Sequence, residues 1–147
     1  MVWKLRRFTS KDRFKLRLRP RSLQSDGKIR PLPSGINVVG AFADFMKYLL
    51  ACTSTFFTEY NANGDRTRWD ALACDAEYVI SHPNGWEGSQ QSKLRQAAAR
   101  AGLVPNTVQG RARIRFVTEG EASLHYCLNE KLIRETLSVR ILRFLHR

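Results

Sequence analysis

The sequence predicts an α/β fold in which parallel strands are joined by crossover helices. Residues 77–129 pass twice from a strand pattern to a helix pattern. Both strands are short and apolar, and the two strand-to-helix junctions read HPNGW at 82–86 and TEGEA at 118–122. Strands that alternate with helices pair in parallel, because each connecting helix crosses back over the sheet.

Charge divides the chain of 147 residues into three segments. Residues 1–35 hold eleven basic and two acidic residues, residues 36–130 hold nine and ten, and residues 131–147 hold five and one. The net charge of +12 therefore belongs to the two ends. We interpret the chain as a basic N-terminal segment, a central α/β domain at 36–130 and a basic C-terminal tail. A hydrophobic content of 43% is enough for a packed core.

The N-terminal segment contains one predicted strand. Phe14, Leu16 and Leu18 alternate with basic residues, which is the period of a half-exposed strand. Pro20 ends this strand, and a turn-rich connector follows as far as residue 35.

Residues 37–62 predict a long helix, with Asn37 as its N-cap and Asn63-Gly64 as its stop. A second helix is predicted within residues 67–76, where Trp69 and Leu72 share a face. The long helix carries an apolar stripe that we interpret as packing: Val38, Phe42, Phe45, Leu49, Phe56 and Tyr60, widened by Met46 and Leu50.

The strand at 78–81 has an uninterrupted apolar run, which predicts a strand covered on both faces. A helix over 89–101 ends before Gly102, the position of a left-handed C-cap. Residues 113–118 predict the next strand, and 120–131 the next helix. We expect 78–81 and 114–117 to be adjacent parallel strands, with the 89–101 helix between them.

Neither disulfide bonds nor a zinc site are indicated. Cys52, Cys74 and Cys127 are odd in number and widely spaced, and with the three histidines they form no metal-binding spacing. No apolar run reaches the roughly 18 to 20 residues that span a bilayer. The N-terminus lacks the apolar core of a signal peptide, whereas a mitochondrial presequence stays open. We take a cytoplasmic location as the default.

Two segments carry a family resemblance, HPNGWEGSQQSKLRQAAARAGL at 82–103 and RIRFVTEGEASLHYCL at 113–128. In order, they hold Pro83 after a strand, a Gln/Arg/Ala-rich helix that ends in Ala-Gly, and Glu119 after the next strand. This arrangement resembles the ATPase domain of the 70-kDa heat-shock protein family. The divergent twelve-type branch found in mushroom-forming fungi is closer, since it has a tryptophan at the place of Trp86. The segments FKLRLRP, PLPSG and FADFMKYL also look like that branch, so the resemblance covers about residues 13–130.

The resemblance implies a partial actin-like ATPase domain of the ribonuclease H-like type, in which two lobes close around ATP and magnesium. Two glycine-rich hairpins hold the phosphates in that family through backbone amides. No Asp-x-Gly-Thr hairpin precedes residue 40, and no Asp-x-Gly-Gly-Gly-Thr hairpin follows Asn129. We therefore expect a fragment that does not bind the nucleotide tightly alone. ATP-driven switching would belong to the complete chaperone-type protein, with client proteins or a completing chain as partners.

Pro83 and Glu119 are the candidate site residues. The resemblance implies that they couple nucleotide state to lobe closure, with Glu119 orienting the attacking water or a magnesium-bound water. A carboxylate at the carboxyl end of a strand lies where open α/β sheets bind ligands. The alternative interpretation is that Pro83 only ends a strand and Glu119 caps the next helix. Glu119 and Glu121 diverge at a helix start and do not suggest a glycosidase pair.

The basic ends suggest a second class of function, a small nucleic-acid-binding protein. Trp3, Phe8 and Phe14 are interspersed with cations, as in proteins that bind single strands. We expect such binding to be weak, nonspecific and salt-dependent. The tail at 131–147 reads as a basic amphipathic helix that rests on a membrane, on a partner or on the chain's own sheet. Its apolar residues are Leu132, Leu137, Ile141, Leu142 and Leu145.

Overall fold

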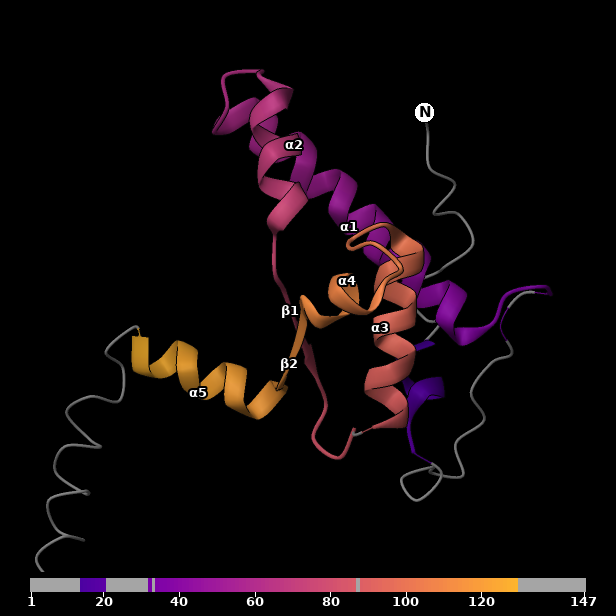
Figure 1. The fold of residues 1–147 in the computed structure, drawn as a ribbon. Helices are drawn as coiled ribbons and strands as arrows, with labels where there is room; N and C mark the ends of the chain where they lie inside the picture. Colours follow the sequence, from indigo (N-terminus) through magenta and orange to yellow (C-terminus); the bar gives the residue numbers. More distant parts are fainter. Residues whose placement is uncertain (1–13, 21–31, 33, 87, 130–147) are drawn as a thin grey trace, which may run out of the picture. The chain divides into compact units, whose positions relative to one another are not determined.

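The described part of the chain is mainly helical and contains one pair of parallel strands (Figure 1). The computed structural model describes residues 14–20, 32, 34–86 and 88–129. In chain order the elements are the 3-10 helix η2 (Phe14–Leu18), α1 (Val38–Tyr60), α2 (Arg66–Asp75), β1 (Tyr78–His82), α3 (Ser89–Ala101), α4 (Val108–Ala112), β2 (Ile114–Thr118) and α5 (Glu119–Asn129). The mixed helix and strand content agrees with the predicted α/β class.

The chain divides into two compact units. The first comprises residues 1–79 and 85–115, and the second comprises residues 80–84 and 116–147. The basic residues 1–13, the connector at 21–31 and the predicted tail helix at 131–147 lie outside the described residues.

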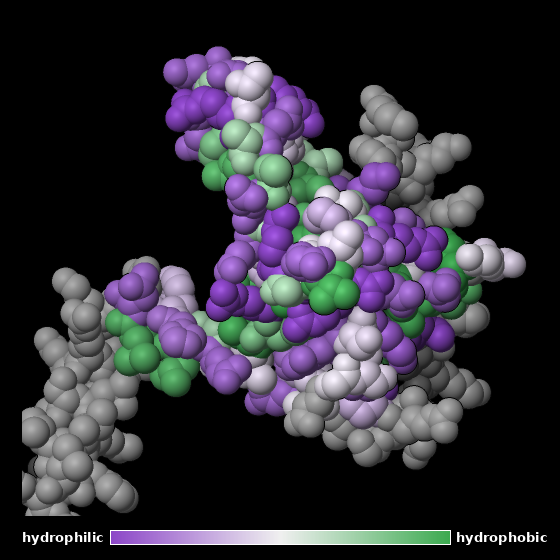
Figure 2. Space-filling model, in the orientation of Figure 1, coloured by the Kyte–Doolittle hydropathy of each residue, from purple (hydrophilic) through white to green (hydrophobic). Residues whose placement is uncertain are grey.

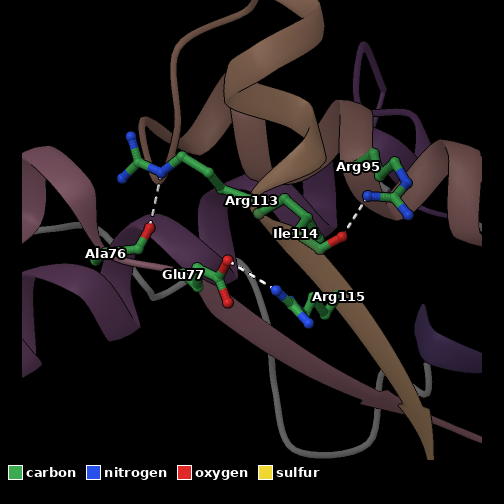
Figure 3. Close-up of polar contacts among 6 residues, drawn as sticks. All are labelled: Ala76, Glu77, Arg95, Arg113, Ile114 and Arg115. Carbon is green, nitrogen blue, oxygen red and sulfur yellow. Dashed lines mark hydrogen bonds and ion pairs between the residues drawn. The ribbon is translucent and has the colours of Figure 1, made fainter.

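β1 and β2 are neighbouring parallel strands, and α3 lies between them in the chain, so this prediction is confirmed. The Tyr78 amide donates a hydrogen bond to the Arg113 carbonyl at 2.9 Å, which fixes the register at the start of the pair. Tyr78, Ile80 and His82 consequently direct their backbone groups toward β2, since these groups alternate along a strand. The backbone groups of Val79 and Ser81 point to the opposite edge. Figure 3 shows the two strands side by side.

The expectation that β1 is covered on both faces is wrong within the described residues. Val79 is 61% exposed and Ser81 is exposed, whereas His82 is buried. The strand therefore has one open face and one partly covered face.

Local capping signals set the bounds of α1, as the sequence predicts. The Asn37 side chain accepts a hydrogen bond from the Gly40 amide at 2.8 Å, and the helix ends just before a turn in which Asn63 and Gly64 both have positive φ. Similarly, Gly102 closes α3 in the left-handed conformation, with φ of 85°, where a residue with a Cβ would be strained.

The core of the first unit lies between α1 and α3. Ala97, Ala98 and Ala101 of α3 are almost completely buried, and such small side chains allow the helix backbones to approach closely. Trp86, which precedes α3, is 3% exposed and packs edge-on against Phe42 with the ring centroids 6.5 Å apart. Hence this tryptophan is part of the core of the first unit.

Much of the predicted aromatic stripe on α1 is exposed. The buried side of the helix holds Phe42, Met46 and Ser54, while the stripe residues Phe45, Leu49, Phe56 and Tyr60 are 42 to 71% exposed. Leu72 of α2 is likewise 51% exposed, although Trp69 on the same helix is buried. Figure 2 shows hydrophobic residues interrupting a mainly hydrophilic surface.

The strand predicted in residues 14–19 is wrong, because Phe14–Leu18 forms the 3-10 helix η2. Phe14 packs against Phe42 and Phe45 of α1, with ring centroids 5.0 and 6.0 Å apart, and Leu18 is 2% exposed. This short helix packs on α1, with Phe14 in ring contact with it and Leu18 buried. A strand would need a paired neighbour, and no described strand adjoins these residues.

Within the first unit, arginine side chains link the start of β2 and the residue before it to α3 and to the end of α2 (Figure 3). Arg113 donates to the carbonyl oxygens of Ala73, Cys74 and Ala76 at the end of α2, at 2.6 to 3.1 Å. These oxygens have no partner within the helix, so Arg113 acts as a C-cap from a distant part of the chain. Arg95 of α3 donates to the Ile114 carbonyl.

Candidate site at the carboxyl ends of the strands

Both junctions of the candidate site follow parallel strands, so they lie at the same edge of the sheet. The first is the end of β1 with Pro83 and Asn84, and the second is the start of α5 after Thr118. All these residues belong to the second unit. Ligands of open α/β sheets bind at this edge, which makes it the candidate site.

At the end of β1, His82 is held inside the unit. Its side chain is 3% exposed, and its ring lies 5.8 Å from the Phe116 ring of β2. The Pro83 carbonyl oxygen lies 2.9 Å from His82 Nδ1 and accepts a hydrogen bond from it. Pro83 directly follows the last strand residue, and it has no N–H to donate.

At the end of β2, Thr118 and Glu121 form a reciprocal capping box. The Thr118 amide donates to Glu121 Oε2 at 2.7 Å, and the Glu121 amide donates to Thr118 Oγ1 at 3.1 Å. The pattern is Thr-x-x-Glu, which sequence reasoning could have recognised as a helix start. The interpretation that Glu119 caps α5 is therefore wrong, because Thr118 and Glu121 supply the cap.

The capping box also explains the charge state of Glu121. Hydrogen bonds from the Thr118 amide and hydroxyl lower the pKa of this carboxyl group, because they stabilise its ionised form. Positive charge at His125 and His82 lowers the same pKa further, while partial desolvation opposes the shift. The junction thus carries a stable negative charge at neutral pH.

The two junctions approach each other through Asn84 and Gly120. A Cβ atom added to Gly120 would lie 3.6 Å from both Nδ2 and Oδ1 of Asn84, which is ordinary van der Waals contact. Glu119 stands between Thr118 and Gly120, is exposed, and accepts a hydrogen bond from Ser123 Oγ through its carbonyl oxygen at 2.8 Å. The structure therefore brings the Pro83 and Glu119 junctions to one place. Sequence reasoning missed Asn84 and Thr118 as parts of it.

These residues do not fit ATP and magnesium as they stand. A phosphate at the start of α5 would need free amides, yet the Glu121 amide is bonded to Thr118 and two glutamates place negative charge there. Among the described residues, no group of three or more His, Cys, Asp or Glu side chains is placed to hold a metal ion. The carboxylates can instead orient a proton donor or a water molecule.

Comparisons with protein-family models, with curated proteins and with solved structures found no match to this chain. The described helices include none that is both long and apolar enough to cross a bilayer.

Proposed function

We propose that this chain is a fragment of a heat-shock-70-like, ATP-binding chaperone-type protein of the cytoplasm. In the complete protein, ATP would supply the energy for a conformational switch. The contribution of this chain would be the pair of junctions that carries Pro83 and Glu119, which move together because both end neighbouring strands.

One observation carries the proposal. The HPNGW and TEGEA junctions, which begin 36 residues apart in the chain, both follow strands of one parallel pair at its carboxyl edge. The Asn84 side chain lies next to the Gly120 position, since a Cβ atom added there would be 3.6 Å from it, so the two junctions are close in space. A displacement of one junction would then shift the other, and a coupling role for Pro83 and Glu119 requires such a joint movement.

Isothermal titration calorimetry with ATP and magnesium tests nucleotide competence. We expect no binding tighter than about millimolar, because the described junctions offer no free amide cradle. Micromolar affinity that is lost in Glu119→Ala would contradict the expectation that this chain does not bind nucleotide alone.

The family assignment has its own test, the sequence of the transcript and of the flanking coding DNA. We expect it to contain the Asp-x-Gly-Thr and Asp-x-Gly-Gly-Gly-Thr hairpins on the two sides of this segment. Flanking sequence that encodes neither hairpin would argue against the proposal. The nucleic-acid alternative rests on residues 1–13, which lie outside the described residues, and stays a prediction from the sequence.

A further inference from the structure

The helix α1 is apolar on two sides. One side packs into the core of the first unit and holds the buried residues Phe42 and Met46. On the other side, a second row of apolar side chains recurs at intervals of three and four residues, so it forms one face of the helix. Its five large members are 37 to 71% exposed, and its cysteine is exposed too. This outer face of α1 consists of Phe45, Tyr48, Leu49, Cys52, Phe56 and Tyr60.

The outer face has the composition of a contact surface. The 23 residues of α1 include only three charged ones, Asp44, Lys47 and Glu59, too few to make its exposed side polar. A helix that is apolar all round is normally buried all round, and a contiguous apolar surface usually marks an interaction site. The rings of Phe56 and Tyr60 stack with their centroids 4.8 Å apart, so they already order each other at one end of the face.

The N-terminal part of the chain already contacts the other end of this face. The Phe14 ring of η2 lies 6.0 Å from the Phe45 ring, centroid to centroid. Residues 1–13, which lie outside the described residues, lead directly into Phe14 and belong to the same compact unit as α1. The chain therefore brings this segment to the start of the outer face.

We infer that residues 1–13 continue from Phe14 along the outer face of α1 and cover it. From Phe45 to Tyr60 the face is about 22 Å long, at about 1.5 Å per helical residue. Thirteen extended residues reach about 43 Å at most, so the segment is long enough to pass the whole face. It also supplies apolar side chains for the contact, namely Val2, Trp3, Leu5 and Phe8.

Charge favours this occupant over a second copy of the same face. Residues 1–13 hold five basic and one acidic residue, whereas residues 36–79 hold three basic and six acidic residues. The segment and the helices therefore attract each other, while two copies of α1 would bring like charges together. Raised salt screens this attraction and weakens the docking. Docking also covers Trp3 and Phe8, so a nucleic acid has to displace the segment before its bases can stack on these rings.

Two thiols of the full chain give a paired test. Cys52 lies in the outer face, whereas Cys74 lies on α2, and peptide mass spectrometry measures the alkylation of each by iodoacetamide. We expect the double substitution Trp3→Ser and Phe8→Ser to speed alkylation of Cys52 by about tenfold, because a cover in place about 90% of the time leaves a tenth of the chains open. The rate at Cys74 should not change. The matched control, Thr9→Ala with Ser10→Ala, should leave Cys52 protected.

A second measurement needs no substitution and covers the case in which the double variant loses its helical circular-dichroism signal. In the unmodified chain, NMR should show nuclear Overhauser contacts between the rings of Trp3 or Phe8 and those of the outer face. The absence of these contacts would overturn the inference, and so would equal alkylation of Cys52 in the unmodified and doubly substituted chains. Protection of Cys52 that grows with protein concentration would assign the face to a second copy and overturn it as well. None of these readouts depends on ATP, so the outcome is independent of the proposed function.

Discussion

At the scale of single residues, Gly110 leaves no room for a side chain. It lies in the short helix α4, and its amide donates to Thr107 Oγ1 at 3.0 Å. A Cβ atom at this position would lie 2.2 Å from the Pro105 carbonyl oxygen and 3.0 Å from its carbon. Backbone atoms cannot move aside as the end of a side chain can. The Pro105 carbonyl therefore comes close enough to require glycine at position 110.

Gly110→Ala should therefore lower the free energy of unfolding by about 1–3 kcal/mol, the usual cost of an overpacked site. Urea unfolding followed by circular dichroism measures it. Gly120→Ala is the matched control, because its added Cβ meets only ordinary contacts and alanine favours a helix. Equal destabilisation by the two substitutions would contradict this account of Gly110.

At the scale of elements, the start of α5 depends on one ionised carboxylate. The folded-state pKa of Glu121 is below its ordinary value of 4.5, so the native state favours the ionised form. A lowered carboxyl pKa adds stability that is complete above the unfolded value and is lost as the pH falls through the folded value. The capping box should hence open in acid below about pH 4.5 and stay closed at neutral pH.

This prediction is tested by following the α5 amides by NMR during an acid titration. We expect the Thr118 amide signal to move with the protonation of Glu121, and the helix to fray in the same range. Glu121→Gln should abolish that pH dependence, whereas Glu119→Gln should keep most of it, because Glu119 lies outside the capping box. Fraying that follows the protonation of Glu119 instead of Glu121 would contradict the assignment of the cap to Glu121.

Elements that rest on local signals could be predicted from the sequence. Asn37 and Gly102 mark helix ends by chemistry that is complete within one turn, and the two apolar strands stand out between breakers. By contrast, the helical turn at Phe14 depends on packing against α1. The same distinction holds for the candidate site. A motif in the sequence located Pro83 and Glu119, whereas the proximity of Asn84 to the Gly120 position arises only in the folded structure.

At the scale of the whole molecule, the uneven charge predicts how the chain meets nucleic acids. The central segment is close to neutral, so oligonucleotide binding should come from the basic ends. We expect it to be weak, indifferent to sequence and abolished near physiological salt, since it arises from counterion release. Deletion of residues 1–12 should remove most of it and leave the helical circular-dichroism signal intact.

Titration of a fluorescent single strand at two salt concentrations, with the full and the deleted chains, decides this point. The nucleic-acid-binding interpretation instead requires submicromolar affinity at physiological salt, with quenching of Trp3 fluorescence as bases stack on it.

The Arg113 cap has a consequence for how the chain is made. Arg113 follows the carbonyl groups that it caps by 37 to 40 residues. A ribosome that adds about 5–20 residues per second needs about 2–8 s to synthesise that stretch. Until Arg113 has been added, the last carbonyls of α2 lack this cap. The α2 helix has a largely polar, exposed surface, and Trp69 is its only buried residue in the folded structure. A delay before capping therefore exposes little apolar surface. Pausing of translation between codons 76 and 113 would lengthen the interval and delay the completion of α2.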